Sequence, residues 1–131
     1  PYYPIEGLLE VPMTTRHIRG MTEGSLKHRI KTLVLGQEFW LRPFTKSMRD
    51  LLNVTKVAEK NSTGYLEFMI HSSELLAGGS PYFKNEEEIE ILYSLLENYF
   101  YMITKNGYKG IGLSDFGRKN ENVKKNKNIV L

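Results

Sequence analysis

One histidine lies where α/β proteins often carry out chemistry. His71 follows residues 65–70, whose nearly continuous hydrophobicity predicts a strand covered on both faces, as in parallel sheets. The carboxyl ends of such strands form the rim at which these folds place their active and binding sites. An imidazole group titrates near neutral pH and can act there as a general acid or base. The histidine could equally cap the strand end by hydrogen bonding, and its position alone leaves both interpretations open.

A short polar loop follows this histidine. It contains a Gly-Gly pair at positions 78 and 79, and glycine lets a backbone approach a bound molecule closely. An aromatic residue comes later in the same loop, where stacking on a sugar ring and packing within the protein are about equally expected. The candidate substrate-binding residues of the loop are Ser72, Ser73, Glu74 and Tyr82.

Helices and strands alternate along the chain around this candidate site. The patterns predict a strand at 8–13, a helix at 25–35, a short strand or packed loop at 39–41, a helix from Thr45 to about 60, a strand at 65–71, a helix at 86–106 and a strand at 108–113. Residues 1–7 and 14–24 are predicted to be loops. Strands separated by helices are typical of an α/β fold with parallel strands and right-handed crossovers.

Capping residues define the ends of two predicted helices. Ser25 and Gly36 suit the start and the end of the first helix, and Asn85 and Gly107 suit those of the last. The expected buried stripes are Leu26, Ile30, Leu33 and Val34 on the first helix, and Ile89, Leu92, Leu96, Tyr99, Phe100 and Ile103 on the last.

Length and charge limit the possible classes of protein. The 131 residues suffice for one domain, and no apolar run approaches the roughly 20 residues of a membrane span. Basic residues are concentrated between positions 118 and 127. We expect residues 1–116 to form the domain and residues 117–131 to be a basic, flexible tail, with binding of an anionic partner by this tail as the alternative. Because the first residue is Pro1 and not methionine, the natural protein is expected to begin upstream.

The chain lacks the residue spacing of a metal site. Its three histidines, at positions 17, 28 and 71, are not three or four positions apart, and it has no cysteine. Its only aspartates are Asp50 and Asp115. We therefore expect no metal to be bound by this chain alone, and we expect His17 and His28 to be solvated.

Five stretches of the sequence share a pattern with a known family. They are Leu-Glu-Phe-Met-Ile-His-Ser-Ser-Glu-Leu at 66–75, Gly-Gly-Ser-Pro-Tyr at 78–82, the acidic helix start at Glu86, the closing segment 107–116, and Leu-Leu-Glu-Val-Pro-Met-Thr at 8–14. Together they resemble the C-terminal part of the NodB-like polysaccharide deacetylases. The similarity covers most of residues 1–116.

This resemblance implies an architecture and a chemistry. The architecture is the C-terminal portion of a distorted (β/α) barrel, with parallel strands and covering helices. The family removes N- or O-acetyl groups from bacterial polysaccharides or glycan precursors by hydrolysis, assisted by a divalent metal, usually zinc, that an aspartate and two histidines hold. His71 matches the family's general acid, which protonates the leaving amine. Phe68 stands where the family has a leucine that lines the acetyl pocket.

The family's metal motifs are missing from this chain. It is therefore predicted to be inactive alone and to need an N-terminal half. The expected partner is an acetylated sugar or polysaccharide, with no nucleic acid and no membrane span, and the open sheet edges of a half-barrel predict a homodimer of the fragment. Two other functions stay open: a non-catalytic carbohydrate-binding or assembly domain of the same fold, and a small α/β interaction module.

Two further features are interpreted as structural. The letters Arg-Pro-Phe at 42–44 are similar to the family's Arg-x-Pro-Tyr motif but come too late in the chain. We expect Arg42 to pair with a surface acid where the next helix begins. Phe39 and Trp40 are expected in the core rather than against a sugar ring.

Overall fold

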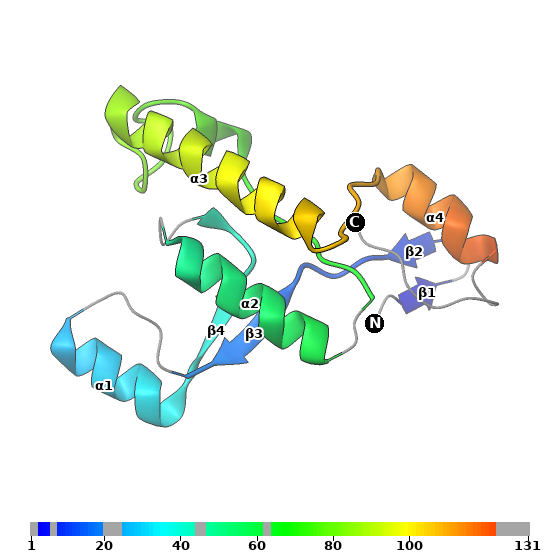
Figure 1. The fold of residues 1–131 in the computed structure, drawn as a ribbon, viewed down its shortest axis with the longest axis horizontal. Helices are drawn as coiled ribbons and strands as arrows, with labels where there is room; N and C mark the ends of the chain where they lie inside the picture. Colours follow the sequence, from blue (N-terminus) through cyan, green and yellow to red (C-terminus); the bar gives the residue numbers. More distant parts are fainter. Residues whose placement is uncertain (1–2, 6–7, 20–24, 44–46, 62–63, 123–131) are drawn as a thin grey trace.

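Two parallel helices form the centre of the fold. The computed structural model describes residues 3–5, 8–19, 25–43, 47–61 and 64–122. Helices α2 (Met48–Lys60) and α3 (Glu86–Lys105) pack against each other and run in the same direction (Figure 1). Because both helices run the same way, the chain between them has to return along their length, and this return places the candidate site.

Local capping sets the ends of both helices. The side chain of Ser47 accepts a hydrogen bond from the backbone N–H of Asp50, and Asn85 accepts one from Glu88 at 2.9 Å. After α3 ends, Gly107 has a φ of +90°, a left-handed conformation that favours glycine. The predicted caps at 85 and 107 are therefore confirmed. Thr45 lies outside the described residues, but Ser47 has an extended backbone and caps α2, so the predicted start at residue 45 was wrong.

Two antiparallel strand pairs precede α2. Strand β3 (Thr15–Ile18) pairs with β4 (Gln37–Trp40), and β1 (Tyr3–Ile5) pairs with β2 (Leu8–Glu10). β1 and β3 lie in segments predicted to be loops, and that prediction was wrong. β3 has only one apolar residue in four, so the pairing with its partner and not its own pattern makes it a strand. Both pairs are antiparallel, so the described residues do not display the expected parallel barrel.

The return segment, residues 65–71, is extended and crosses the end of the β3–β4 pair. The Glu67 N–H donates to Thr14 Oγ1 at 2.8 Å, and the Met69 N–H donates to the Leu41 carbonyl at 3.0 Å. The Thr14 N–H donates in turn to the Glu67 carbonyl at 3.4 Å. The predicted strand at 65–71 is not formed: two bonds with Thr14 and one to Leu41 stand in place of a continuous ladder.

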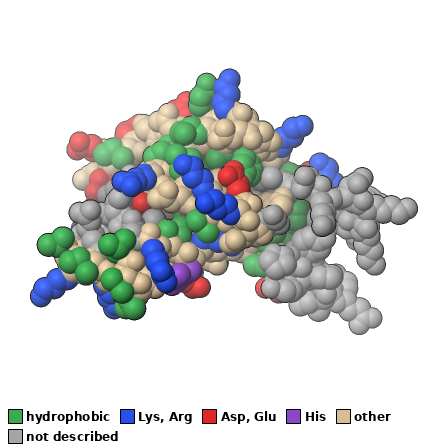
Figure 2. All heavy atoms as spheres, turned by 60° about the horizontal axis from the view of Figure 1, so that its bottom comes forward, with side chains coloured by type: hydrophobic (Ala, Val, Ile, Leu, Met, Phe, Trp, Pro, Cys, Tyr) green, Lys and Arg blue, Asp and Glu red, His purple; other side chains and the backbone are tan. Residues whose placement is uncertain are grey.

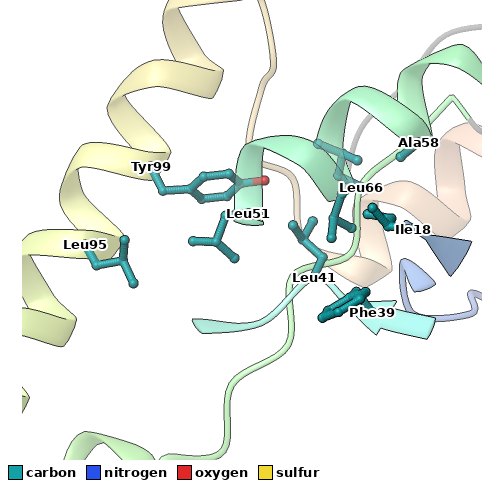
Figure 3. Close-up of a cluster of buried hydrophobic side chains, with 9 residues drawn as sticks. Ile18, Phe39, Leu41, Leu51, Ala58, Leu66, Leu95 and Tyr99 are labelled. Atoms are coloured by element: carbon teal, nitrogen blue, oxygen red, sulfur yellow. The ribbon is translucent and has the colours of Figure 1, made fainter. Parts of the chain in front are cut away.

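The main core lies between the helices, the hairpin and the return segment. Tyr99 projects from α3 towards α2, with its hydroxyl end near Leu51 (Figure 3). The hydroxyl shares a 2.7 Å hydrogen bond with Thr55 Oγ1, so its burial leaves no polar group unpaired. The other buried members of this cluster are Ile18, Phe39, Leu41, Val54, Ala58, Leu66 and Leu95.

Helix α1 (Leu26–Leu35) has the predicted bounds but not the predicted environment. The stripe expected to be buried is exposed instead. The helix lies in the connection between β3 and β4 and projects away from α2 and α3 (Figure 1). Periodicity identified an apolar face correctly, but it could not show whether anything covers that face.

The C-terminal part of the described chain is helical. The strand predicted at 108–113 was wrong: residues 108–112 are irregular and α4 (Leu113–Asn122) follows. Gly110 and Gly112 weaken strand formation in this segment. Phe116 is buried and its ring centroid lies 5.7 Å from that of Tyr65. The first part of the predicted tail, residues 117–122, continues this helix, and residues 123–131 lie outside the described residues.

Because Tyr99 is buried, the free energy of unfolding depends on pH in the alkaline range. Desolvation raises the pKa of Tyr99 to about 12, with a further increase from the charge of Glu59 that the bond to Thr55 partly opposes. Below pH 10 both the folded and the unfolded chain keep this proton. Between about pH 10 and 12 only the unfolded chain releases it, so the free energy of unfolding falls as pH rises.

We predict that Tyr99→Phe removes part of this pH dependence. At pH 7 the variant should lose about 1 kcal/mol because the bond to Thr55 is gone. Between pH 10 and 12 its stability should fall less steeply than that of the wild type, as measured by urea unfolding. Tyr101→Phe, on the exposed side of α3, should keep the wild-type slope. Equal slopes for Tyr99→Phe and the wild type would contradict the prediction.

Candidate functional site

Residues 71–83, here called the His71 loop, contain most of the predicted site. The loop follows the return segment and is fastened to the N-terminal half of α3. Phe83, at its end, is completely buried with Ile89 and Leu92. Ile70 and Leu75 pack against this second apolar cluster. Hydrophobic burial therefore holds both ends of the loop.

A buried ion pair ties the start of the loop to the end of β4. Glu74 belongs to the short 3-10 helix η2 (Ser72–Leu75), and its Oε1 accepts a hydrogen bond from Arg42 Nη2. Its Oε2 accepts one from the backbone N–H of His71 at 3.0 Å. The Arg42 and Glu74 side chains are only 12% and 3% exposed, so each charge depends on the other for compensation. One carboxylate thus fixes both the position of η2 and the backbone of the candidate histidine.

Glycine is required at two positions of the loop. Gly78 has a φ of +72°, and its N–H donates to the Phe83 carbonyl at 3.0 Å. A Cβ atom at Gly79 would lie 2.3 Å from the carbonyl oxygen of Ser73, which is closer than any side chain tolerates. The loop is therefore folded tightly on itself, so the glycines serve its internal packing.

The exposed side of the loop presents several polar and aromatic groups. His71, Ser72 and Ser73 are exposed, and so is the ring of Tyr82. The guanidinium carbon of Arg42 lies 5.6 Å from the centroid of that ring, a cation–π contact. An imidazole, two hydroxyls and an aromatic ring are the groups that could transfer a proton, bond sugar hydroxyls and stack on a sugar ring.

Two other predicted site residues are not on the exposed side of the loop. Both oxygens of Glu74 are engaged within the protein, and the residue is buried. Phe68 packs into an aromatic cluster, with ring centroids 5.6 Å from Tyr99 and 5.1 Å from Phe100. Side chains alternate along an extended segment, so Phe68 points to the core side, opposite to His71. Contact of either residue with a substrate remains an expectation.

Arg42 is the residue whose role the sequence analysis missed. Its predicted partner was a surface acid, and this was wrong because the partner is buried Glu74. A usable signal was present: an arginine that directly follows the apolar run 39–41 enters a desolvated environment and needs a nearby carboxylate. Sequence alone did not show which carboxylate.

Glu67 carries a second desolvated carboxyl group, on the return segment. Partial burial raises its pKa above the ordinary glutamate value. Its Oε2 is buried without a hydrogen-bond partner among the described residues. By the alternation of an extended chain it lies on the same side as His71, but four residues away and thus about 13 Å along the segment. It is too distant along the chain to orient that imidazole directly.

The side chains present do not fit the metal that the family resemblance implies. In the described part of the chain, no three His, Cys, Asp or Glu side chains are grouped so that they could hold an ion. His17 is exposed, and its Nε2 lies 3.1 Å from the Leu35 carbonyl oxygen. Asp50 is buried in the first turn of α2, and Asp115 pairs with Arg118 at 2.7 Å. The side chain of His28 lies outside the description. No catalytic step is therefore derived through a metal.

Comparisons with protein-family models, with curated proteins and with solved structures found no match to this chain. Among the described helices, none is both long enough and apolar enough to cross a membrane. The function consequently has to be argued from the site itself.

We predict strong coupling between Arg42 and Glu74. Arg42→Met or Glu74→Leu alone should lower the free energy of unfolding by about 3–5 kcal/mol, because each leaves a buried charge without its partner. The double variant should lose clearly less than the sum, as a urea double-mutant cycle would show. The exposed pair of Asp115 and Arg118 is the matched control, and the same cycle there should give a coupling energy under about 1 kcal/mol. Additive losses at 42 and 74 would contradict the coupling.

Gly79 should tolerate no side chain. Gly79→Ala is expected to cost about 1–3 kcal/mol in urea unfolding, because the new Cβ has to displace the Ser73 backbone. Gly110→Ala is the matched control: a Cβ there meets nothing within 4 Å, and stability should change by less than about 0.5 kcal/mol. Equal effects of the two substitutions would show that the loop is not packed as described.

Proposed function

We propose that this chain is the C-terminal part of a carbohydrate deacetylase and that His71 is its general acid. The observation that carries the proposal is an exposed imidazole on a loop whose backbone is held by a buried carboxylate. The sequence resemblance at 66–82 supports the same role. Pre-positioning of a proton donor lowers the cost of reaching the reactive geometry, which is what hydrolysis of an acetylated sugar requires.

The side chains of the loop divide the reaction into separate tasks. When the bond between the acetyl carbon and the sugar nitrogen breaks, that nitrogen leaves as an amine and needs a proton, which the His71 imidazolium donates. The hydroxyls of Ser72 and Ser73 can bond sugar hydroxyls, and the Tyr82 ring offers an apolar face for a sugar ring. In this proposal the metal ligands and the base that activates water come from chain outside these 131 residues.

A second candidate function is carbohydrate binding without catalysis. It is favoured because the described residues include no group of side chains that could hold a metal, and because both Tyr82 and Trp40 are exposed. Contrary to the expectation that placed it in the core, Trp40 is exposed at the end of β4, two residues before Arg42. Both candidates use the exposed side of the His71 loop, and they differ in whether the histidine transfers a proton.

The test is His71→Ala in the natural protein that contains this chain, supplied with zinc and N-acetylglucosamine oligomers. Loss of the general acid should lower kcat by about 10²–10⁴-fold while KM changes little. Folding should be unaffected because the side chain is exposed. His17→Ala, a change at another exposed histidine, is the control and should keep the wild-type kcat.

Two outcomes decide between the candidates. If the wild-type protein binds the oligomers without releasing acetate, and Tyr82→Ala abolishes that binding, the non-catalytic function replaces the deacetylase. If it releases acetate and His71→Ala does so at the wild-type rate, the general-acid role is wrong.

A further inference from the structure

Helix α1 presents an unpaired apolar stripe to solvent. Leu26, Ile30, Leu33 and Val34 are 55–72% exposed. Their spacing puts them within about 100° of arc on one side of the helix. Thr32, on the opposite side, is buried. A polar residue of the helix is therefore buried while its apolar stripe faces outwards, the reverse of an ordinary surface helix.

The position of α1 makes this stripe accessible. The helix occupies the connection between β3 and β4 and projects from the body of the molecule (Figure 1). Its C-terminal end is held at the hairpin, where the His17 ring bonds the Leu35 carbonyl and Gly36 turns the chain with a φ of +71°. These contacts hold the C-terminal end of the helix at the β3–β4 hairpin.

Basic residues accompany the apolar stripe. Lys27 and Lys31 are exposed on α1, one turn apart. The sequence 26–35 contains no acidic residue. Figure 2 shows the result on the surface: hydrophobic side chains gather over α1, with lysine and arginine side chains at the edge of the patch. An apolar face with a cationic border is the pattern of helices that lie in a membrane interface.

We propose that α1 docks onto an anionic lipid bilayer, with its apolar stripe among the acyl chains and Lys27 and Lys31 at the headgroups. Charge decides between this occupant and a second copy of the chain. Packing α1 against another α1 would bring the same basic residues together without any acid to compensate them. An anionic bilayer provides apolar depth and negative charge at the same time. A ten-residue helix supplies little area, so binding is reversible and sensitive to salt.

The test is co-sedimentation of the full chain with vesicles of phosphatidylglycerol and phosphatidylcholine, compared with phosphatidylcholine alone. The wild type should bind the anionic vesicles and release them as salt is added. Leu33→Gln with Val34→Gln should weaken binding about tenfold or more, through lost apolar burial. Lys27→Gln with Lys31→Gln should weaken it about tenfold and reduce the salt dependence.

Matched controls separate the helix from the rest of the surface. Ile91→Gln with Tyr101→Gln removes exposed apolar side chains from α3, and Lys56→Gln with Lys60→Gln removes exposed charges from α2. Both pairs should bind as the wild type does.

The proposal is overturned if the wild type does not bind, if it binds neutral vesicles equally well, or if the α1 variants bind as the wild type does. Sedimentation equilibrium that shows a dimer, broken by Leu33→Gln with Val34→Gln while vesicle binding persists, assigns the stripe to a second copy instead. His71→Ala should not alter vesicle binding, so this test is independent of the proposed enzymatic function.

Discussion

The buried pair of Arg42 and Glu74 is the interaction on which the candidate site depends. It joins segments 32 positions apart in sequence, and it leaves little of either side chain exposed to water. The second carboxylate oxygen holds the backbone N–H of His71. Because separating a desolvated pair is costly, the pair restrains the neighbouring loop and, with it, the backbone that carries the exposed imidazole.

The hydrophobic packing provides the frame in which that pair can form. α2 and α3 are held in parallel by a core that includes the Thr55–Tyr99 hydrogen bond, and the return segment between them passes the end of the β3–β4 pair. This passage brings residue 71 next to the segment that begins at residue 41. A separate small cluster around Phe83 then closes the loop onto α3. Burial sets the arrangement, and the polar contacts select one conformation of the loop within it.

Local signals in the sequence predicted more than non-local ones. Asn85, Gly36 and Gly107 marked helix ends correctly, because capping depends on a few neighbouring residues. The polar strand β3 was missed since its partner is about 20 residues away and its own pattern is weak. The exposed groups of the His71 loop were identified from residue type, but the bonds of Glu74 and the aromatic packing of Phe68 required three-dimensional contacts. The parallel barrel remains a hypothesis.

The alternation of side chains along residues 65–71 has a consequence for how this segment can change over evolutionary time. Leu66 and Phe68 contribute to the main core, Ile70 to the smaller cluster, and the odd-numbered positions face the other way. Insertion or loss of one residue would exchange the two sides and separate these three apolar side chains from the clusters in which they pack. Changes of length are therefore tolerated here only in steps of two, whereas the hairpin connection that carries α1 has no such parity to preserve.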